Sequence, residues 1–274
     1  MNWQCLIVSA ALLTATSAMA QRGPIAVPKA LPGDVSPRIA PSQCGGFEGH
    51  FGPLDFRGIN PQDKRVVEQY HFDMELRTFL SGRLVGRNRA GTSEVVGGFD
   101  YVLKAIPNHP TALLVMEQLG RKLKSENPQN NELPLECYYL RAFMIAPDDP
   151  VVRLMYGIYL AYRGRVDEAK YNLDLGDDGL RAQAAMQHQI GLTNIELKRY
   201  EKAQLNALRI RRAAFALKSV EQQLKAAKRW DENLVLPADD LKEAEPEERP
   251  ESGTASSAGL AALAASAPAV PASR

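Results

Sequence analysis

The chain has 274 residues, with 33 Lys and Arg against 32 Asp and Glu, so its formal net charge is +1. Such a balance gives no overall electrostatic bias towards nucleic acid, anionic lipid or an acidic substrate. The composition is 45% hydrophobic, 24% charged and 7% aromatic, which suits a folded soluble protein. It excludes a collagenous, wholly disordered, multi-span membrane or disulfide-dense chain.

Residues 1–20 have the pattern of a secretory signal peptide. Residues 5–16 are apolar (C-L-I-V-S-A-A-L-L-T-A-T), and the tripeptide Ala18-Met19-Ala20 predicts cleavage before Gln21. The run is shorter than the roughly 20 residues of a spanning helix. We therefore expect a periplasmic or secreted protein with no stable membrane insertion after cleavage. The alternative is an ordinary buried N-terminal helix.

Cleavage would remove Cys5 and leave two cysteines, Cys44 and Cys137. An even count in an exported protein predicts one disulfide between them, because the compartment is oxidising. Two buried thiols are the alternative. The pair does not form a structural zinc site, since such a site needs four ligands at short spacing.

Two irregular segments follow the signal peptide. Residues 21–46 contain five prolines and form a Pro-rich linker, because each Pro blocks helix formation. Residues 47–98 are expected to form an irregular N-terminal wrap that begins F-E-G-H-F-G-P-L-D-F, a string too apolar for a free linker and too rich in Gly for a helix. One helix is predicted within it, over 65–80, followed by a polar loop over 82–98.

From residue 99 the pattern is helical and contains a repeat of about 34 residues. Gly157 and Gly191 have this separation, as do Ala169 and Ala203, which lie in the similar strings G-R-V-D-E-A-K and K-R-Y-E-K-A-Q. Small residues at this spacing indicate positions where paired helices cross closely. A helix-turn-helix repeat of this length resembles the tetratricopeptide (TPR) family.

Units in this register begin at Pro110, Pro150 and Ala184. The resemblance implies an all-α fold: an antiparallel helix-hairpin (TPR-like) repeat array over 99–235, with a terminal helix that runs to Trp230. The sequence departs from the family pattern in several places. Trp and Tyr are absent from their usual positions in each unit, and the string G-D-D-G at 176–179 is expected to disturb the end of a helix.

TPR proteins bind partners along a groove lined by the first helix of each unit, and the resemblance implies such a groove here. The transferred positions are Leu114, Gln118, Arg121, Leu154, Ile158, Tyr162, His188 and Leu192. A clamp for a C-terminal carboxylate is not expected, because the Asn position of such clamps holds Gln, Ile and Leu in the three units. The middle of the groove is apolar. Either an extended apolar peptide binds there, or the chain's own wrap fills it, since an empty groove would expose a large apolar patch. We favour the wrap, because a disulfide from Cys44 to Cys137 would tether it to the first unit.

The last segment, residues 236–274, is acidic and then rich in Ala, Ser and Pro, and it is predicted to be disordered. It follows a basic stretch in which Arg209, Arg211 and Arg212 form the expected basic face. Two interpretations stay open: the acidic segment screens this face within the chain, or it is only a solubilising tail.

Motifs for catalysis, metal binding or cofactor binding do not occur in the sequence: it has no H-E-x-x-H, C-x-x-C, phosphate-binding loop or nucleophile elbow. The predicted function is that of an exported TPR-like scaffold or adaptor without catalysis or cofactor, which binds a protein or peptide and no nucleic acid. Resemblance to short exported TPR proteins places it in a bacterial envelope or secretion assembly. The alternatives are an enzyme with a site near His71, Asp73 and Glu75, and a structural accessory subunit of an envelope complex.

Overall fold

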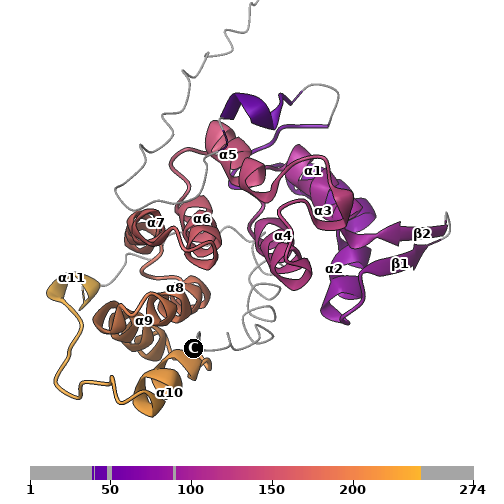
Figure 1. Cartoon of the computed structure of the whole chain (residues 1–274). Coiled ribbons are helices and arrows are strands. Elements are labelled where there is room, and N and C mark those ends of the chain that lie inside the picture. Colours follow the sequence, from indigo (N-terminus) through magenta and orange to yellow (C-terminus); the bar gives the residue numbers. More distant parts are fainter. Residues whose placement is uncertain (1–38, 40, 48–50, 89–90, 242–274) are drawn as a thin grey trace, which may run out of the picture.

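The computed structural model describes residue 39 and residues 41–47, 51–88 and 91–241 (Figure 1). The described residues form eleven α-helices, two short 3-10 helices and one two-stranded antiparallel sheet. The expectation of a helical protein is confirmed. The predicted signal peptide, most of the Pro-rich linker and nearly all of the predicted tail lie outside the described residues. Within the described ranges, no helix has the length and apolar character needed to cross a membrane.

The region predicted to be an irregular wrap with one helix contains a small helical unit. Helix α1 (Pro61–His71) is followed at once by α2 (Asp73–Leu80). The break between them falls at Phe72, where the backbone leaves the helical region (φ −131°). The Phe72 ring is buried and packs edge-on against Phe99, with ring centroids 5.8 Å apart. This buried ring explains why the predicted single helix is divided.

The predicted polar loop contains a hairpin that the sequence analysis missed. Strands β1 (Val85–Asn88) and β2 (Gly91–Glu94) pair antiparallel with Val85 opposite Glu94, and α3 (Val95–Ala105) follows directly. Each strand is short and rich in Gly and polar residues, so its alternation carries too little signal for prediction. Figure 1 shows the hairpin projecting from the helical body.

Six helices follow, of which the last four pack as two close pairs. They are α4 (Pro110–Leu123), α5 (Leu135–Ile145), α6 (Pro150–Tyr162), α7 (Val166–Gly179), α8 (Ala184–Glu196) and α9 (Tyr200–Arg212). Short connections make α6 and α7, and likewise α8 and α9, antiparallel neighbours, whereas residues 124–134 separate α4 from α5. Helix α6 contacts both α4 and α8, so these three helices form one layer, with α7 beside α6 and α9 beside α8 (Figure 1).

Helices α4 and α6 begin with the same local chemistry. Each starts with a Pro, which has no N–H to leave unpaired in the first turn. The preceding side chain caps the helix: Nδ1 of His109 accepts from the N–H of Ala112 at 3.1 Å, and the Asp149 carboxylate accepts from the N–H of Val151 at 2.9 Å. These caps fix the residues at which α4 and α6 begin.

The two glycines that define the repeat lie at helix crossings, as predicted. A Cβ on Gly157 would stand 2.9 Å from Cγ of Leu173 in α7, and a Cβ on Gly191 would stand 3.0 Å from both methyl carbons of Val220. Both distances are shorter than ordinary carbon–carbon contacts. The absence of a side chain at these positions therefore lets the helices approach.

The glycines of the G-D-D-G string have a similar role and do not disturb the helix. Helix α7 continues to Gly179, and a Cβ on Gly176 would stand 3.0 Å from the backbone nitrogen of Leu154. The expected disturbance was wrong, because the small residues allow α7 to lie directly on the backbone of α6.

The predicted disulfide between Cys44 and Cys137 is present. It fastens the 3-10 helix η1 (Pro41–Cys44) to α5, with both cysteines buried and their Cα atoms 5.2 Å apart. Arg141 of α5 reinforces the contact, because its Nη1 donates to the carbonyl oxygens of Cys44 and Gly46 at 3.0 and 2.6 Å. A chain segment 93 residues distant in sequence is thus bonded to the first helix pair.

Residues 51–57 lie across the turn between α3 and α4. The N–H of Leu54 donates to the carbonyl oxygen of Ala105 at 2.9 Å, and the N–H of Phe56 donates to Oδ1 of Asn108 at 2.8 Å. The wrap is therefore held on an interhelical turn by its own backbone hydrogen bonds.

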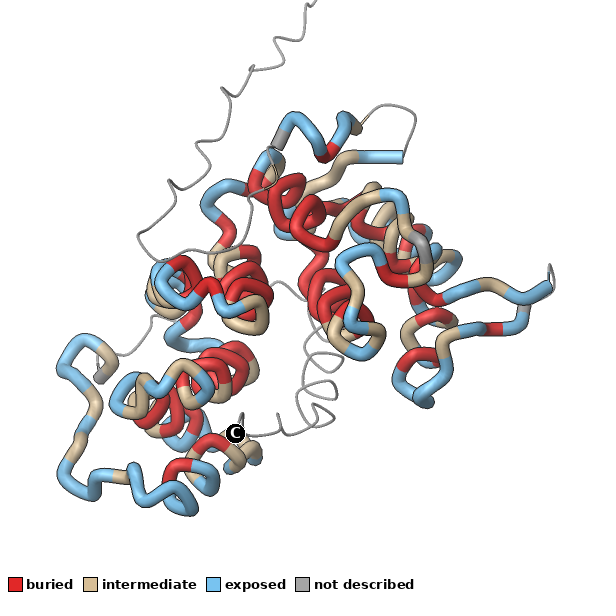
Figure 2. Tube along the Cα trace, viewed as in Figure 1, coloured by how far each residue is buried: buried red, intermediate tan, exposed pale blue. Residues whose placement is uncertain are grey.

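At the other end, α10 (Ser219–Ala226) and the C-terminal strap, which we define as residues 231–241, pack on α9. The strap begins where the backbone of Asp231 exchanges two hydrogen bonds with the Gln204 side chain. It ends in α11 (Ala238–Leu241). Helices α9 and α10 share a small core of their own, separate from the main core, which runs from α1 to α8; Figure 2 shows the buried positions along these helices.

Candidate partner-binding face of helices α4, α6 and α8

Half of the residues predicted to line the groove belong to the interior. Leu114, Leu154, Ile158 and His188 are each at most 4% exposed. The expectation of an apolar groove floor is corrected here, because packing in the core leaves these four side chains almost no exposed surface. The remaining predicted residues are partly exposed, and they are Gln118, Arg121, Tyr162 and Leu192.

Two of these accessible residues belong to a ladder of side chains that crosses the layer of first helices. The guanidinium of Arg121 lies 3.8 Å from the ring centroid of Tyr162, a cation–π contact. The Tyr162 hydroxyl donates to Oε1 of Glu196 at 3.0 Å. These residues come from α4, α6 and α8 respectively, and we call them the Arg121–Tyr162–Glu196 ladder. One chain of contacts thus joins three successive first helices.

A buried carboxylate supports the ladder from below. Oε1 of Glu117, which is 1% exposed, lies 3.5 Å from Nε of Arg121 and 2.5 Å from Nη1 of Arg163. Burial raises the pKa of Glu117, although the two guanidinium groups oppose this shift. Arg163 also donates to Glu126, which accepts from the Tyr159 hydroxyl. Arg121 is therefore held in position before any partner arrives.

The Tyr162 hydroxyl keeps its role as a donor at neutral pH. Burial is the main reason that the pKa of Tyr162 rises to about 12, and the charge of Arg121 opposes the rise. The hydroxyl therefore stays protonated and donates to Glu196. A partner would meet a guanidinium, an aromatic ring and a carboxylate in a fixed order along the face.

His188 faces the terminal helix and takes no part in the ladder. Its Nε2 is 2.5 Å from the hydroxyl oxygen of Ser219 at the start of α10. Burial lowers the pKa of His188 to about 4, so the ring is neutral at physiological pH. The residue joins α8 to α10, and its assignment to the groove was wrong.

The predicted basic face is largely paired within the chain. Arg209 is 2.8 Å from Asp177 and 3.0 Å from Asp240, whose side chain is 2% exposed. Arg211 is 2.8 Å from Glu221, and Arg212 is exposed at the end of α9. Arg209 and Arg211 therefore have acidic partners inside the structure. For Arg209 one of these partners comes from the strap, as the interpretation of screening by an acidic segment expects.

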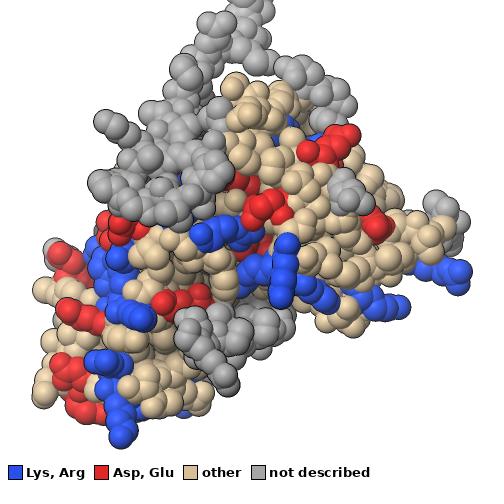
Figure 3. Space-filling view, in the orientation of Figure 1, with Lys and Arg blue, Asp and Glu red and all other residues tan. Residues whose placement is uncertain are grey.

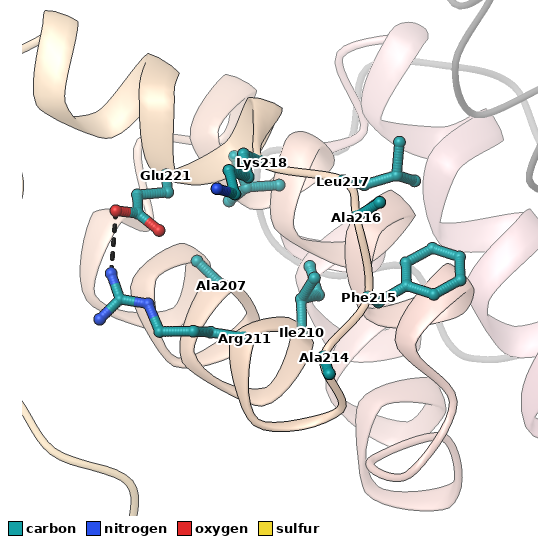
Figure 4. Close-up of a pocket in the computed structure, with 10 residues that line it drawn as sticks. Ala207, Ile210, Arg211, Ala214, Phe215, Ala216, Leu217, Lys218 and Glu221 are labelled. Atoms are coloured by element: carbon teal, nitrogen blue, oxygen red, sulfur yellow. Dashed lines mark ion pairs between the residues drawn. The ribbon is translucent and has the colours of Figure 1, made fainter.

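A cavity of about 420 Å³ lies between the end of α9, the connector 213–218 and the start of α10 (Figure 4). Its lining includes Ile210, Phe215 and Val220. The ion pair of Arg211 with Glu221 lies at its border. The sequence analysis missed this cavity because it expected one terminal helix through Phe215, whereas α10 begins only at Ser219.

The residues of the enzyme alternative do not converge. The His71 ring stacks on Tyr101 at 3.6 Å between centroids. Glu75 is buried beside Gly98, while Asp73 is exposed at the start of α2. His71 and Glu75 thus both lie against α3, whereas Asp73 faces solvent.

The described part of the wrap does not cover the face. Phe56 packs edge-on against His109 at 4.9 Å between ring centroids, and Arg57 pairs with Asp148 at 3.1 Å. Both contacts lie at interhelical turns, away from the Arg121–Tyr162–Glu196 ladder. The expectation that the wrap fills the groove is corrected for the residues described, because its backbone hydrogen bonds hold it elsewhere.

A comparison with protein-family models finds no match, and comparisons with curated proteins and with solved structures find none either.

Proposed function

We propose that this chain is an exported, TPR-like helical adaptor that binds a protein or peptide partner along the face of α4, α6 and α8, in a bacterial envelope or secretion assembly. Three features support the TPR-like part. The sequence repeats at about the TPR period, α6 packs closely with α7 and α8 with α9, and both repeat glycines lie at helix crossings. Such arrays serve mainly as binding surfaces.

The Arg121–Tyr162–Glu196 ladder is the observation that carries the binding proposal. Arg and Tyr are among the residues that contribute most to binding energy at protein interfaces, because they combine a large contact area with polar groups. Here they are partly exposed and held by the buried Glu117. Binding of a partner would therefore cost little free energy for ordering these two side chains.

The accessible chemistry of the face also indicates the kind of partner. The apolar residues expected on the groove floor are in the core, so an apolar peptide has little to contact. Arg121 and Glu196 instead favour a polypeptide segment that carries both hydrogen-bonding and charged side chains. The proposed partner is thus a polar, extended segment that crosses the three helices.

The buried disulfide supports export. Disulfides persist in oxidising compartments such as the periplasm and are rare in reducing ones. The bond between Cys44 and Cys137 ties the chain near the predicted signal peptide to α5. We accordingly propose a periplasmic or secreted location for the mature protein.

The test compares the proteins captured from an envelope extract by the unchanged affinity-tagged chain and by two variants of it. Arg121→Ala with Tyr162→Ala removes the ladder, and Tyr171→Ala is the matched control because Tyr171 is 51% exposed on α7. We expect a defined protein to copurify with the unchanged chain and with the control, and to be lost with the ladder variant. Equal capture by all three variants, at equal melting temperature, would contradict the proposal.

A further inference from the structure

Exposed cations gather at the end of the molecule that carries the β-hairpin. They lie at the end of α2, in the turn that leads into β1, in β1 itself and at the end of α4. In chain order they are Arg77, Arg83, Arg87, Lys122 and Lys124. Figure 3 shows blue side chains over this part of the molecule, from α4 towards the projecting hairpin. We call these five residues the hairpin-end cations.

Defined contacts bring them together. Lys122 of α4 donates from Nζ to the carbonyl oxygen of Gly82 at 2.9 Å, which joins the end of α4 to the turn after α2. Along β1 alternate residues share a face. Gly86 is buried against Thr78 of α2, so Arg83 and Arg87 both lie on the opposite, solvent-exposed side. The cations therefore share one outer surface.

None of the hairpin-end cations forms an ion pair with another described residue. Nε of Arg77 donates to the backbone oxygen of Asp73, and Nε of Arg83 donates to the Ser81 hydroxyl. Glu94, on β2, is the acidic residue of the hairpin. The arginines at the other end of the chain, such as Arg209, are paired internally. The near-zero net charge of the chain thus conceals a local basic surface whose cations have no acidic partner among the described residues.

Two exposed apolar side chains lie among these cations. Leu80, the last residue of α2, is 44% exposed, and Val85, between Arg83 and Arg87, is 47% exposed. Apolar residues flanked by Lys and Arg on a projecting element are typical of surfaces that lie in a membrane interface. There the cations meet lipid phosphates while the apolar side chains reach the acyl boundary.

We propose that the hairpin-end surface binds peripherally to an anionic lipid bilayer. The hairpin projects from the helical body (Figure 1), so a flat surface can reach it. The surface would then hold the protein at a membrane while the ladder remains available to a polypeptide. This binding is independent of the proposed adaptor function and needs no spanning helix.

The experiment measures binding of the purified protein to vesicles. One set contains equal parts of phosphatidylglycerol and phosphatidylcholine, and the other contains phosphatidylcholine alone. Binding to the anionic vesicles is expected to exceed binding to the neutral ones and to weaken as salt rises, because salt screens exposed charges. Each cation near an anionic surface contributes about fivefold to affinity.

A patch variant, Arg83→Gln with Arg87→Gln and Lys122→Gln, should therefore bind the anionic vesicles roughly 100-fold more weakly. The matched control is Lys198→Gln with Lys218→Gln and Lys228→Gln, which removes the same charge from exposed positions elsewhere and should bind as the unchanged chain does. Both variants share the same N-terminal segment, so that segment does not account for a difference between them.

A further variant separates the apolar contribution from the charges. Leu80→Ser with Val85→Ser should weaken binding several-fold while the salt dependence stays unchanged. Equal binding to the two vesicle types would overturn the proposal, as would equal loss in the patch and control variants. Binding of poly-glutamate to the patch, without binding to vesicles, would likewise overturn it and identify an acidic polypeptide as the occupant.

Discussion

The two ends of the described chain are fastened to the helix array by different physical means. The N-terminal end is bonded to α5 by the disulfide between Cys44 and Cys137. The C-terminal strap is held by the Asp240–Arg209 ion pair and by the hydrogen bonds of Gln204. A covalent bond is unaffected by salt, whereas an ion pair weakens as charges are screened or neutralised. The attachment of the N-terminal end therefore depends on whether the compartment is oxidising. The attachment of the C-terminal strap depends on salt and pH.

The largest effect should come from removal of the covalent attachment. Cys44→Ser with Cys137→Ser opens a loop that spans 93 residues, and the chain-entropy model then predicts a loss of about 4–5 kcal/mol in the free energy of unfolding. Urea denaturation of the two proteins measures the difference. A loss below about 1 kcal/mol would show that the bond adds little to contacts such as those of Arg141.

Low pH should lower the stability of the C-terminal helices, because it protonates His188. Its pKa is about 4 in the folded state, below the roughly 6.5 of an unfolded chain. The stability that depends on neutral His188 is fully present above pH 6.5 and is lost as the pH falls towards 4. Linkage gives at most about 3 kcal/mol over this window. Denaturation at a series of pH values should show a flatter profile for His188→Gln, and identical profiles would refute the assignment.

The stability of the crossing between α6 and α7 should depend on the size of the side chain at position 157. Gly157→Leu places a side chain against Leu173 and should lower the free energy of unfolding by about 1–3 kcal/mol through overpacking. Gly97→Leu is the control, because Gly97 is exposed in α3 and a Cβ there meets nothing within 4 Å. Equal melting temperatures for the two variants would show that α6 and α7 do not cross closely.

The smallest effect should come from the strap. Asp240→Asn removes the charge that faces Arg209, yet Arg209 keeps Asp177 as a partner and the strap can move away to let in water. The side-chain oxygen of Asn can still accept from Arg209, so we expect a loss of about 1 kcal/mol. Limited proteolysis should cut the variant faster within residues 231–241, and high salt should reduce the difference. Cleavage at the same rate in both proteins would show that the pair does not hold the strap.

Local and periodic signals in the sequence predicted part of this fold correctly. The disulfide followed from an even cysteine count, and the helix starts at Pro110 and Pro150 followed from Pro in the first turn. The repeat spacing located Gly157 and Gly191 at crossings. Each of these predictions depends on neighbouring residues or on a fixed period, and both can be read from the sequence without the structure.

The predictions that failed depend on distances between segments. Leu154 lies on the expected face by register, but Gly176 lets α7 cover it. Arg209 looks free in the sequence, and only the folded chain places Asp177 and Asp240 beside it. The ladder is another such case, because Tyr162 meets Glu196 from a different helix. Periodicity locates a residue on a helix face, but tertiary packing decides whether that face is exposed.

The central claim is that the face of α4, α6 and α8 binds a polypeptide partner, and site-specific photo-crosslinking in cells tests it most directly. A photoreactive amino acid would replace Gln118, which is partly exposed on this face, or Leu175, which is 42% exposed on α7. We predict a discrete crosslinked protein from position 118, lost when Tyr162 is replaced by Ala, and none from position 175. No crosslink at position 118, or the same crosslinks at both positions, would contradict the claim.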